Sequence, residues 1–366
     1  MSFITGIGTA NPANRLNQNQ VADFMVRSMQ LDRDNERRLR AVFNASGIKS
    51  RHTVLEDYGR SENFDFFPNT PGLEPFPSTK SRIEEFKTHA LQLSLAAVWD
   101  INKDRFKPST LTHLITVCCT GMYAPGLDLD LVRELNLSSH VQRTCVNFMG
   151  CYAAINAIRL ADSICQSNPK ARVLIVCTEL CSLHFQKQVS YDNFLANALF
   201  ADGAAAMIVE STRVGNALEL ESFYCDILPD GKAEMTWEIG DLGFEMKLSS
   251  YIPSLIKSGI GGLAKALLGM VGLTLSEIKF FAVHPGGKKI LQAIESEFGF
   301  DRSHLSYSYD VLANYGNMSS PTIIFVLKRI FDTLSEADNN ERVLSFAFGP
   351  GLTLESAVLK VKTDVE

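Results

Sequence analysis

The chain has 366 residues, of which 46% are hydrophobic and 21% are charged, and its formal net charge at pH 7 is −6. These values are typical of a folded protein large enough for two cores, and the acidic balance argues against a general nucleic-acid-binding protein. The sequence has no apolar run long enough for an integral membrane segment and no signal-peptide pattern, so we expect a cytoplasmic protein.

The first elements alternate between strand and helix patterns. Residues 3–8 predict a short strand. Asn17 and Gln20 form a capping-box pattern that predicts a helix to about residue 30. The next predicted elements are a helix over 35–44, an irregular proline-rich excursion over 63–78, a helix over 81–99, a strand over 111–120 and a helix over 128–135.

A basic segment overlaps the first two predicted helices. Its seven basic residues are accompanied by three acids, Asp32, Asp34 and Glu36. This face could meet a phosphorylated ligand, although a solvated helix surface is the commoner explanation. The basic residues are Arg27, Arg33, Arg37, Arg38, Arg40, Lys49 and Arg51.

Cys151 follows a glycine at the point where an apolar run becomes a buried helical pattern that stops before Pro169. A helix N-terminus favours an anion and lowers the pKa of a thiol, so Cys151 is a candidate nucleophile. A buried core cysteine is the alternative. The eight cysteines lie mostly within apolar runs and lack zinc-ligand spacing, so we expect reduced thiols and no metal site.

The remaining patterns continue the alternation and predict an α/β layered core. Polarity rises over residues 211–217, which predicts two halves, 1–214 and 215–366. The predicted elements are strands over 172–177, 201–209, 279–284, 343–348 and 353–361, and helices over 258–270, 288–297 and 321–333, the last capped by Ser319 or Ser320 with Pro321 at its first position.

Two further residues share the setting of Cys151 at the end of an element. His284 ends a strand at Pro-Gly-Gly, and Asn317 precedes a helix. Each also has a structural explanation, as a core histidine and a turn residue. The order Cys, His, Asn, and the interval between Cys151 and His284, also fit papain-like cysteine proteases, in which ~130–150 residues separate these two groups. A long globular segment before Cys151 argues against that alternative.

Four segments together resemble the signatures of the type III polyketide synthases, the chalcone-synthase-like family of the thiolase superfamily. They are Phe-Met-Gly-Cys151-Tyr-Ala-Ala, Val-His284-Pro-Gly-Gly, Asn-Tyr-Gly-Asn317-Met-Ser-Ser and Ala347-Phe-Gly-Pro-Gly351-Leu-Thr. The match extends over nearly the whole chain and is greatest with bacterial alkylresorcinol and alkylpyrone synthases.

The resemblance implies a thiolase-type α/β fold, in which duplicated αβαβα halves form a five-layered core in a homodimer. It also implies a catalytic trio of Cys151, His284 and Asn317, without a cofactor other than the CoA thioesters that serve as substrates. Cys151 would take an acyl group from an acyl-CoA, and His284 with Asn317 would stabilise the enolate formed by decarboxylation of malonyl-CoA.

Substrate residues follow from the same resemblance. Phe200 and Phe244 resemble two phenylalanines at the gate between the CoA tunnel and the cavity, and Gly349 and Pro350 resemble the loop of the cavity floor. Positions that line the cavity in chalcone synthases hold Cys119, Ala124, Cys181 and His184 here. These differences favour a fatty-acyl starter, with a pyrone or resorcinol product. A single-condensation 3-oxoacyl synthase is the alternative.

The CoA-binding residues depart most from the plant enzymes. Arg38 retains one basic position, whereas two others are Ala41 and Ala45. Lys288 and Lys289 could supply the missing charge. Delivery of the acyl group by an acyl carrier protein is therefore the alternative to delivery by CoA.

Overall fold

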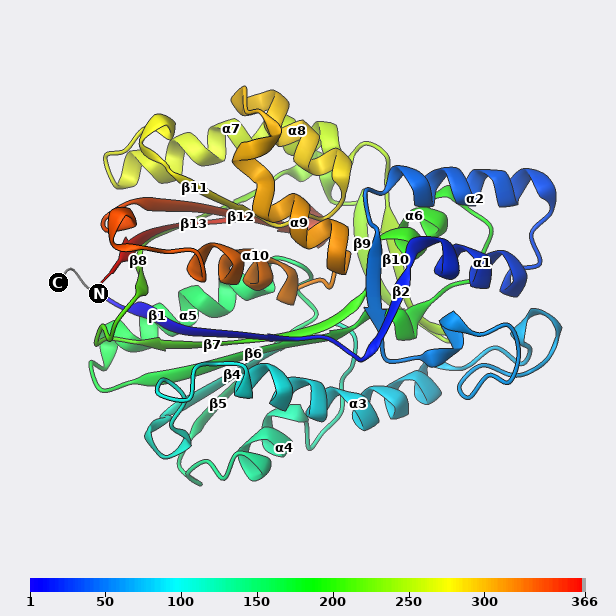
Figure 1. Cartoon of the computed structure of the whole chain (residues 1–366), viewed down its shortest axis with the longest axis horizontal. Coiled ribbons are helices and arrows are strands. Elements are labelled where there is room, and N and C mark those ends of the chain that lie inside the picture. The colour runs from blue at the N-terminus through cyan, green and yellow to red at the C-terminus, as the bar shows by residue number, and fades with distance from the viewer. Residues whose placement is uncertain (364–366) are drawn as a thin grey trace.

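The computed structural model describes residues 1–363, with strands of both halves joined in one mixed sheet (Figure 1). Among these residues nine strands follow the order β11-β12-β13-β8-β1-β7-β6-β4-β5. Their bounds are β1 Phe3–Ala10, β4 His113–Cys118, β5 Gln142–Asn147, β6 Arg172–Leu180, β7 Asp202–Glu210, β8 Ala217–Ile227, β11 Phe280–Val283, β12 Arg342–Gly349 and β13 Thr353–Lys362. Two shorter ladders pair β2 Asn14–Asn17 with β3 Ser50–Thr53, and β9 Met235–Gly240 with β10 Gly243–Leu248.

The helices lie on both faces of the strands and at one end of the molecule. Figure 1 shows α1, α2, α6 and the β9–β10 hairpin together at that end. The helices of the described chain are α1 Gln18–Ser28, α2 Arg33–Ala45, α3 Thr79–Trp99, α4 Leu127–Glu134, α5 Ala153–Ser167, α6 Tyr191–Leu199, α7 Ile252–Met270, α8 Lys288–Phe298, α9 Ser306–Tyr315 and α10 Pro321–Phe331.

The two halves of the sheet repeat one topology. In the first half β4 and β6 are parallel, β6 and β7 antiparallel, and β7 and β1 antiparallel. In the second half β11, β12, β13 and β8 have the same order and the same directions. The halves meet where β1 pairs with β8, and the predicted division at residues 214 and 215 falls in the connection before β8. This is the duplicated arrangement that the resemblance implies.

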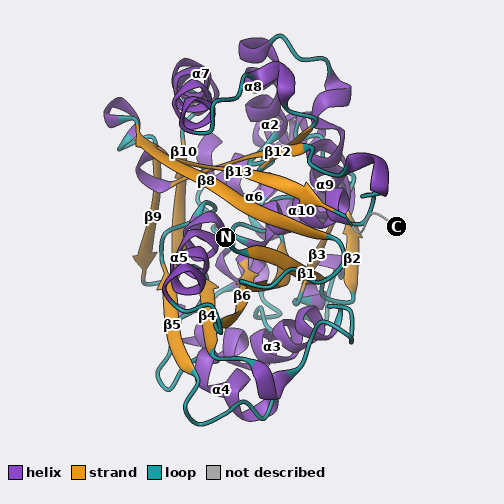
Figure 2. Ribbon diagram, turned by 90° about the vertical axis from the view of Figure 1, so that its left-hand side faces the viewer, coloured by secondary structure: helices purple, strands orange, loops and turns teal. Residues whose placement is uncertain are grey.

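Two central helices, α5 and α10, lie between the strands of the two halves (Figure 2). α5 contacts β4, β6 and β7 but also β13, and α10 contacts β1 and β7 but also β11. α3 and α4 cover the outer face of the first half, while α7 packs on β8 and β13 and α8 packs on α7. The result is five alternating layers of helix and strand.

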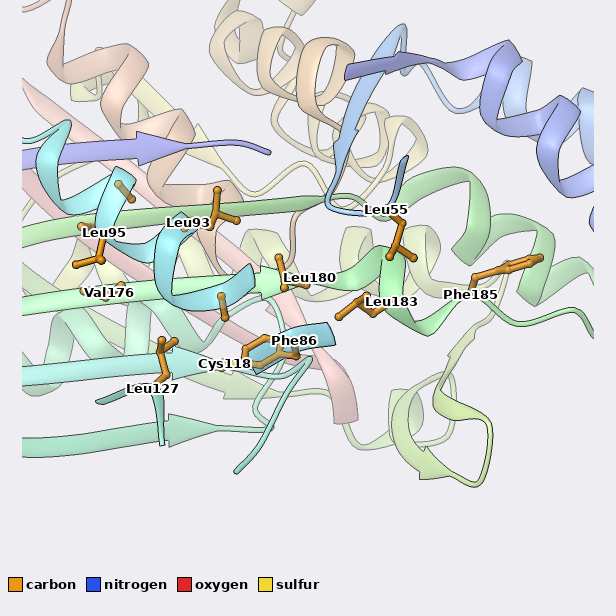
Figure 3. Close-up of a cluster of buried hydrophobic side chains, with 14 of the residues drawn as sticks. Leu55, Phe86, Leu93, Leu95, Cys118, Leu127, Val176, Leu180, Leu183 and Phe185 are labelled. Atoms are coloured by element: carbon orange, nitrogen blue, oxygen red, sulfur yellow. The ribbon is translucent and has the colours of Figure 1, made fainter. Parts of the chain in front are cut away.

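Each half has an apolar core on its outer side, and a third apolar cluster between them contains residues of both halves. Figure 3 shows the cluster beneath α3, where Phe86, Leu93 and Leu95 face Val176 and Leu180 of β6. β6 is buried along almost its whole length because helices cover both of its faces. Its continuous apolar sequence is therefore explained by its place in the middle of the layers.

Most predicted elements are confirmed, including the capping box of Asn17 and Gln20 and the start of α10 at Pro321. The elements that were not predicted are β2, β3, β5, α6, β8, α9 and the β9–β10 hairpin. β5 is largely exposed, so its sequence lacks the alternation of apolar and polar residues that predicts a strand. α9 is rich in polar residues, so its sequence lacks a clear apolar helical pattern. The predicted helix over 258–270 was too short, since α7 begins at Ile252.

Replacing Leu95 with alanine tests the packing of the first core. Leu95 is 2% exposed, so we expect Leu95→Ala to lower the free energy of unfolding by about 2–5 kcal/mol. Leu242→Ala is the control, because Leu242 is 44% exposed, and it should change stability by no more than about 0.5 kcal/mol. Urea denaturation measures both. Equal effects of the two variants would contradict the packing described here.

Candidate active site

One cavity of about 340 Å³ brings together the three predicted catalytic residues, Cys151, His284 and Asn317. Cys151 lies two residues before α5, His284 follows β11, and Asn317 lies between α9 and α10. All three side chains are buried. Residues from distant parts of the chain meet here because the duplicated topology brings the starts of both central helices to the same end of the strands.

Cys151 is held by a close contact between two loops. Gly150, which precedes it, has φ +86, and a Cβ at this position would lie 2.2 Å from Cδ of Pro350. Only glycine therefore fits at position 150, because the backbone is in the left-handed region and there is no room for a Cβ. The N–H of Gly150 also donates to Sγ of Cys119 at 3.0 Å. These contacts set the position of the thiol in the cavity wall.

Asn317 is fixed in orientation by its oxygen. The N–H of Ser319 donates to Oδ1 at 2.8 Å, and Sγ of Cys151 lies 3.9 Å from the same atom. Its backbone exchanges two hydrogen bonds of 2.9 Å with Leu199 and Ala201, on either side of Phe200. The nitrogen Nδ2 makes only a long contact of 3.4 Å with the carbonyl of Gly286. The amide is thus arranged to donate a hydrogen bond into the cavity.

His284 lines the same cavity, and neither of its ring nitrogens has a hydrogen-bond partner among the described residues. Its backbone N–H donates to the carbonyl of Phe346 at 2.8 Å, which fixes the end of β11 against β12. A buried polar group without a partner is costly, and such groups cluster at functional sites. The imidazole is therefore available to a ligand in the cavity.

Burial reverses the predicted effect on the thiol. The sequence analysis expected the helix N-terminus to lower the pKa of Cys151, but desolvation raises this pKa to about 12. Burial also lowers the pKa of His284 to about 3. Desolvation therefore favours a neutral thiol and a neutral imidazole in the folded protein. For the thiol, this direction is the opposite of the one expected from the helix N-terminus.

Glu179, on β6, is a buried carboxylate that the sequence analysis did not identify as part of the site. Its Oε2 accepts hydrogen bonds from the N–H of Cys119 at 2.9 Å and the hydroxyl of Thr120 at 2.8 Å, and its Oε1 accepts one from the hydroxyl of Ser320 at 2.7 Å. Since Ser320 precedes α10, this carboxylate joins the two halves. Glu179 could have been recognised from the sequence, because it lies in an otherwise apolar strand. A buried carboxylate needs several hydrogen-bond donors, so it marks a polar network.

An aromatic group forms another wall of the cavity. The rings of His184 and Phe244 are parallel, with centroids 4.2 Å apart. Nε2 of His184 donates to the carbonyl of Thr120 at 2.7 Å, and its Nδ1 accepts from the N–H of Phe244 at 3.0 Å. Burial lowers the pKa of His184 to about 3, so the ring is neutral. Trp237, also absent from the predictions, packs edge-on against both rings.

The other predicted site residues divide into two groups. Those that line the cavity are Cys119, Cys181, His184, Phe200, Phe244, Lys288, Lys289 and Pro350. Gly349 lies behind the wall, where a Cβ would lie 2.6 Å from the ring of Tyr152. Arg38 is exposed on α2 and does not line the cavity, so the structure does not bring this predicted CoA-binding residue to the site.

Residues 1–363 contain neither a metal-binding cluster nor a membrane-spanning helix. Within them no group of three or more His, Cys, Asp or Glu side chains is arranged to hold a metal ion. No helix in this part of the chain combines the length and apolar character that crossing a membrane requires. The eight cysteines, all in this part, are free thiols.

The neutral state of His284 has a consequence for stability in acid. In the unfolded chain its pKa is about 6.5, so below this pH the unfolded state takes up a proton that the folded state, with its pKa of about 3, does not. The free energy of unfolding should fall from pH 6.5 to 4.5 by up to about 1.4 kcal/mol per pH unit for this residue. Urea denaturation of His284→Gln should show a correspondingly shallower acid slope. An unchanged slope would show that the imidazole is charged in the folded protein.

Comparison with known proteins places this geometry in a family. The chain matches the description "Chalcone and stilbene synthases, N-terminal domain" over residues 1–213 and the corresponding C-terminal domain over residues 219–363. It is 30% identical to "Alpha-pyrone synthesis polyketide synthase-like Pks18" of Mycobacterium tuberculosis, covering 99% of this chain and 91% of that protein. It is also 32% identical to "Probable polyketide synthase 1" of Dictyostelium discoideum, of whose length it spans only 11%.

Solved structures agree. The C-terminal type III polyketide synthase domain of Steely1, a type I/III hybrid from Dictyostelium, superposes with a TM-score of 0.90 at 30% identity, covering 98% of this chain and 99% of that one. PKS-I from the brown alga Ectocarpus siliculosus gives 0.89 at 27% identity, covering 98% of each chain. The chain therefore belongs to the chalcone and stilbene synthase family, and it is a type III polyketide synthase with a thiolase-type fold.

Proposed function

We propose that this enzyme transfers an acyl group from an acyl-CoA to Cys151, extends it by repeated decarboxylative condensation with malonyl-CoA, and cyclises the product to a pyrone or resorcinol. The observation that carries the proposal is the meeting of Cys151, His284 and Asn317 in one buried cavity. The name of the mycobacterial relative, which refers to alpha-pyrone synthesis, further supports the proposal.

Acyl transfer begins from the neutral pair. As Sγ of Cys151 attacks the thioester carbonyl, His284 accepts the thiol proton, so the charge that burial disfavours exists only while the substrate is reacting. The tetrahedral intermediate then expels the CoA thiolate, which takes the proton back from His284. The acyl-enzyme and neutral CoA remain, and the imidazole returns to its neutral form.

Decarboxylation uses the same imidazole as a donor. A neutral imidazole donates through one N–H, and the Asn317 amide donates through Nδ2, which its fixed oxygen turns toward the cavity. Both bonds go to the malonyl thioester carbonyl. Loss of CO₂ leaves the electron pair on that oxygen as an enolate, whose carbon attacks the acyl carbonyl on Cys151. The Cys151 thiolate leaves, the chain is two carbons longer, and preorganised donors stabilise the charge throughout.

The shape and lining of the cavity favour a fatty-acyl starter. Apolar residues predominate along it, from α1, α2 and α6 and from the β9–β10 hairpin. They include Val21, Met25, Val42, Leu195, Met235 and Met246. A hydrocarbon chain gains most from such a lining, because burial removes its apolar surface from water. Incubation with acyl-CoAs of increasing length tests this. Pyrones or resorcinols from long-chain starters would support it, and a single 3-oxoacyl product would refute iterative extension.

We further propose that the enzyme works in the cytoplasm as a homodimer and requires no cofactor beyond its CoA substrates. The free thiols agree with a reducing compartment. β5 is an edge strand of the sheet with exposed side chains, and an unpaired edge offers hydrogen bonds to a second copy. Sedimentation of the purified protein measures the oligomeric state.

Two variants separate the proposed catalytic roles. Asn317→Ala removes one donor to the enolate and should lower malonyl-CoA decarboxylation by about 10²–10³-fold, which corresponds to ~2.7–4 kcal/mol of barrier. Cys151→Ala should abolish formation of the acyl-enzyme and of extended products but keep decarboxylation. Release of labelled CO₂ and intact-protein mass spectrometry measure the two steps. If Asn317→Ala decarboxylates at the wild-type rate, the proposed role of the amide is wrong.

His184→Thr tests the aromatic wall. Threonine is too short to donate to the carbonyl of Thr120 and accept from the N–H of Phe244 at once, so Phe244 should lose its position. We expect a changed distribution of product lengths and ring types, measured by liquid chromatography and mass spectrometry. His304→Thr is the matched control, because His304 is exposed and outside the cavity lining. Identical product patterns for all three proteins would refute the assignment.

A further inference from the structure

A basic hollow on α2 lies directly beside the substrate cavity. Its lining belongs to one stretch of the helix, namely Arg33, Glu36, Arg37, Arg40, Ala41 and Asn44. Ala41 lines both this hollow and the cavity that holds Cys151. The hollow and the cavity are therefore neighbours on the surface, and a molecule seated in one lies at the entrance of the other.

Only one of the three arginines that line the hollow, Arg40, is neutralised by ion pairs. Arg40 forms ion pairs with Asp23 at 2.7 Å and with Glu36 at 2.8 Å. Arg33 and Arg37 are exposed, and neither has an ion-pair partner within residues 1–363. Unpaired surface charges of one sign steer a partner of the other sign, although the whole chain carries a net charge of −6.

Basic residues also stand on the opposite side of the entrance. Lys288 and Lys289 begin α8 and line the cavity. A Cβ on Gly47, just after α2, would lie 3.3 Å from the side chain of Lys288, so α8 begins beside the C-terminal end of α2. Lys49, nearby in sequence, is exposed. The entrance is thus flanked by two lysines of α8, with Lys49 in the segment after α2.

The part of α2 that faces the entrance is uncharged. Ala41, Val42 and Ala45 line the cavity. With a rise of 1.5 Å per residue, Arg37 lies about 6 Å and Arg33 about 12 Å further along the helix axis, away from the entrance. The narrow passage consequently suits a neutral thioester arm, while most of the α2 charge lies outside it, on a surface that Figure 1 shows at the edge of the molecule.

We propose that this surface, made of Arg33, Arg37, Lys288 and Lys289, docks an acidic acyl carrier protein, which serves beside acyl-CoA as a second donor of the starter. The inference rests on the proposed function. The phosphopantetheine arm would pass between α2 and α8 to Cys151, and the acidic body of the carrier would sit on the arginines. The nucleotide of free CoA has fewer partners at the entrance, because Ala41 and Ala45 offer it no charge. The arginines are spread along α2 outside the entrance, so an acidic protein surface can contact more of them than one nucleotide can.

The experiment compares two forms of one starter. Dodecanoyl groups are presented either on a bacterial fatty-acid-synthase acyl carrier protein or on CoA, and kcat/KM is measured for wild type and for Arg33→Glu/Arg37→Glu. We expect the variant to lose about 10-fold or more with the carrier protein at low ionic strength, and less than about 2-fold with CoA. The matched control is Lys103→Glu/Lys170→Glu, whose lysines are exposed and follow α3 and α5, away from the entrance; it should behave as wild type.

Each other outcome overturns the proposal. Equal losses with both substrates would make the hollow a site for the CoA nucleotide, and no loss with the carrier protein would show that the arginines do not contact it. A failure of the proposed function itself is distinguished by the dodecanoyl N-acetylcysteamine thioester, which needs neither surface. If wild type extends this small substrate but does not accept the carrier protein, only the docking inference fails.

Discussion

Desolvation at the junction of the two halves is the constraint on which the site depends. Burial in the cavity raises the pKa of the Cys151 thiol and lowers the pKa of the His284 imidazole, so it favours the neutral form of each. A neutral imidazole has one nitrogen that accepts a proton and one that donates a hydrogen bond. The same residue can then serve acyl transfer as a base and decarboxylation as a donor. A permanently charged imidazolium could perform only the second role.

The fold creates that junction by duplication. Because both halves have the same topology, the starts of α5 and α10 converge, and Cys151 and Asn317 precede them. Glu179 stabilises the convergence by accepting hydrogen bonds from the loop after β4 and from Ser320 before α10. Burial raises the pKa of Glu179 above its usual value, and the hydrogen bonds from these donors offset part of that rise. The distances between the catalytic groups thus follow from how the halves are joined.

Sequence reasoning was effective where burial is periodic and where residues stand at element ends. The continuous apolar run of β6, the capping box of α1 and the start of α10 at Pro321 were predicted correctly, and Cys151, His284 and Asn317 were identified as candidates. The expected side-chain cap of α10 was wrong, because the Ser320 hydroxyl donates to Glu179 instead. Periodicity does not show which distant loops converge, so the expectation that these three residues meet rested on the family resemblance. Their order and spacing alone also fitted a protease. The pKa direction for Cys151 was wrong since burial depth is a property of the assembled layers. Trp237 and the hairpin were missed because their burial depends on the cavity they enclose.

The most direct test of the account is to identify the acylated atom, because Cys119, Cys151 and Cys181 all line the cavity. The enzyme is incubated with dodecanoyl-CoA in the absence of malonyl-CoA, quenched, digested and analysed by tandem mass spectrometry. The account predicts one acyl group per chain on Cys151, formed more slowly in His284→Gln. An acyl group on Cys119 or Cys181, or acylation of Cys151 that does not depend on His284, would contradict it.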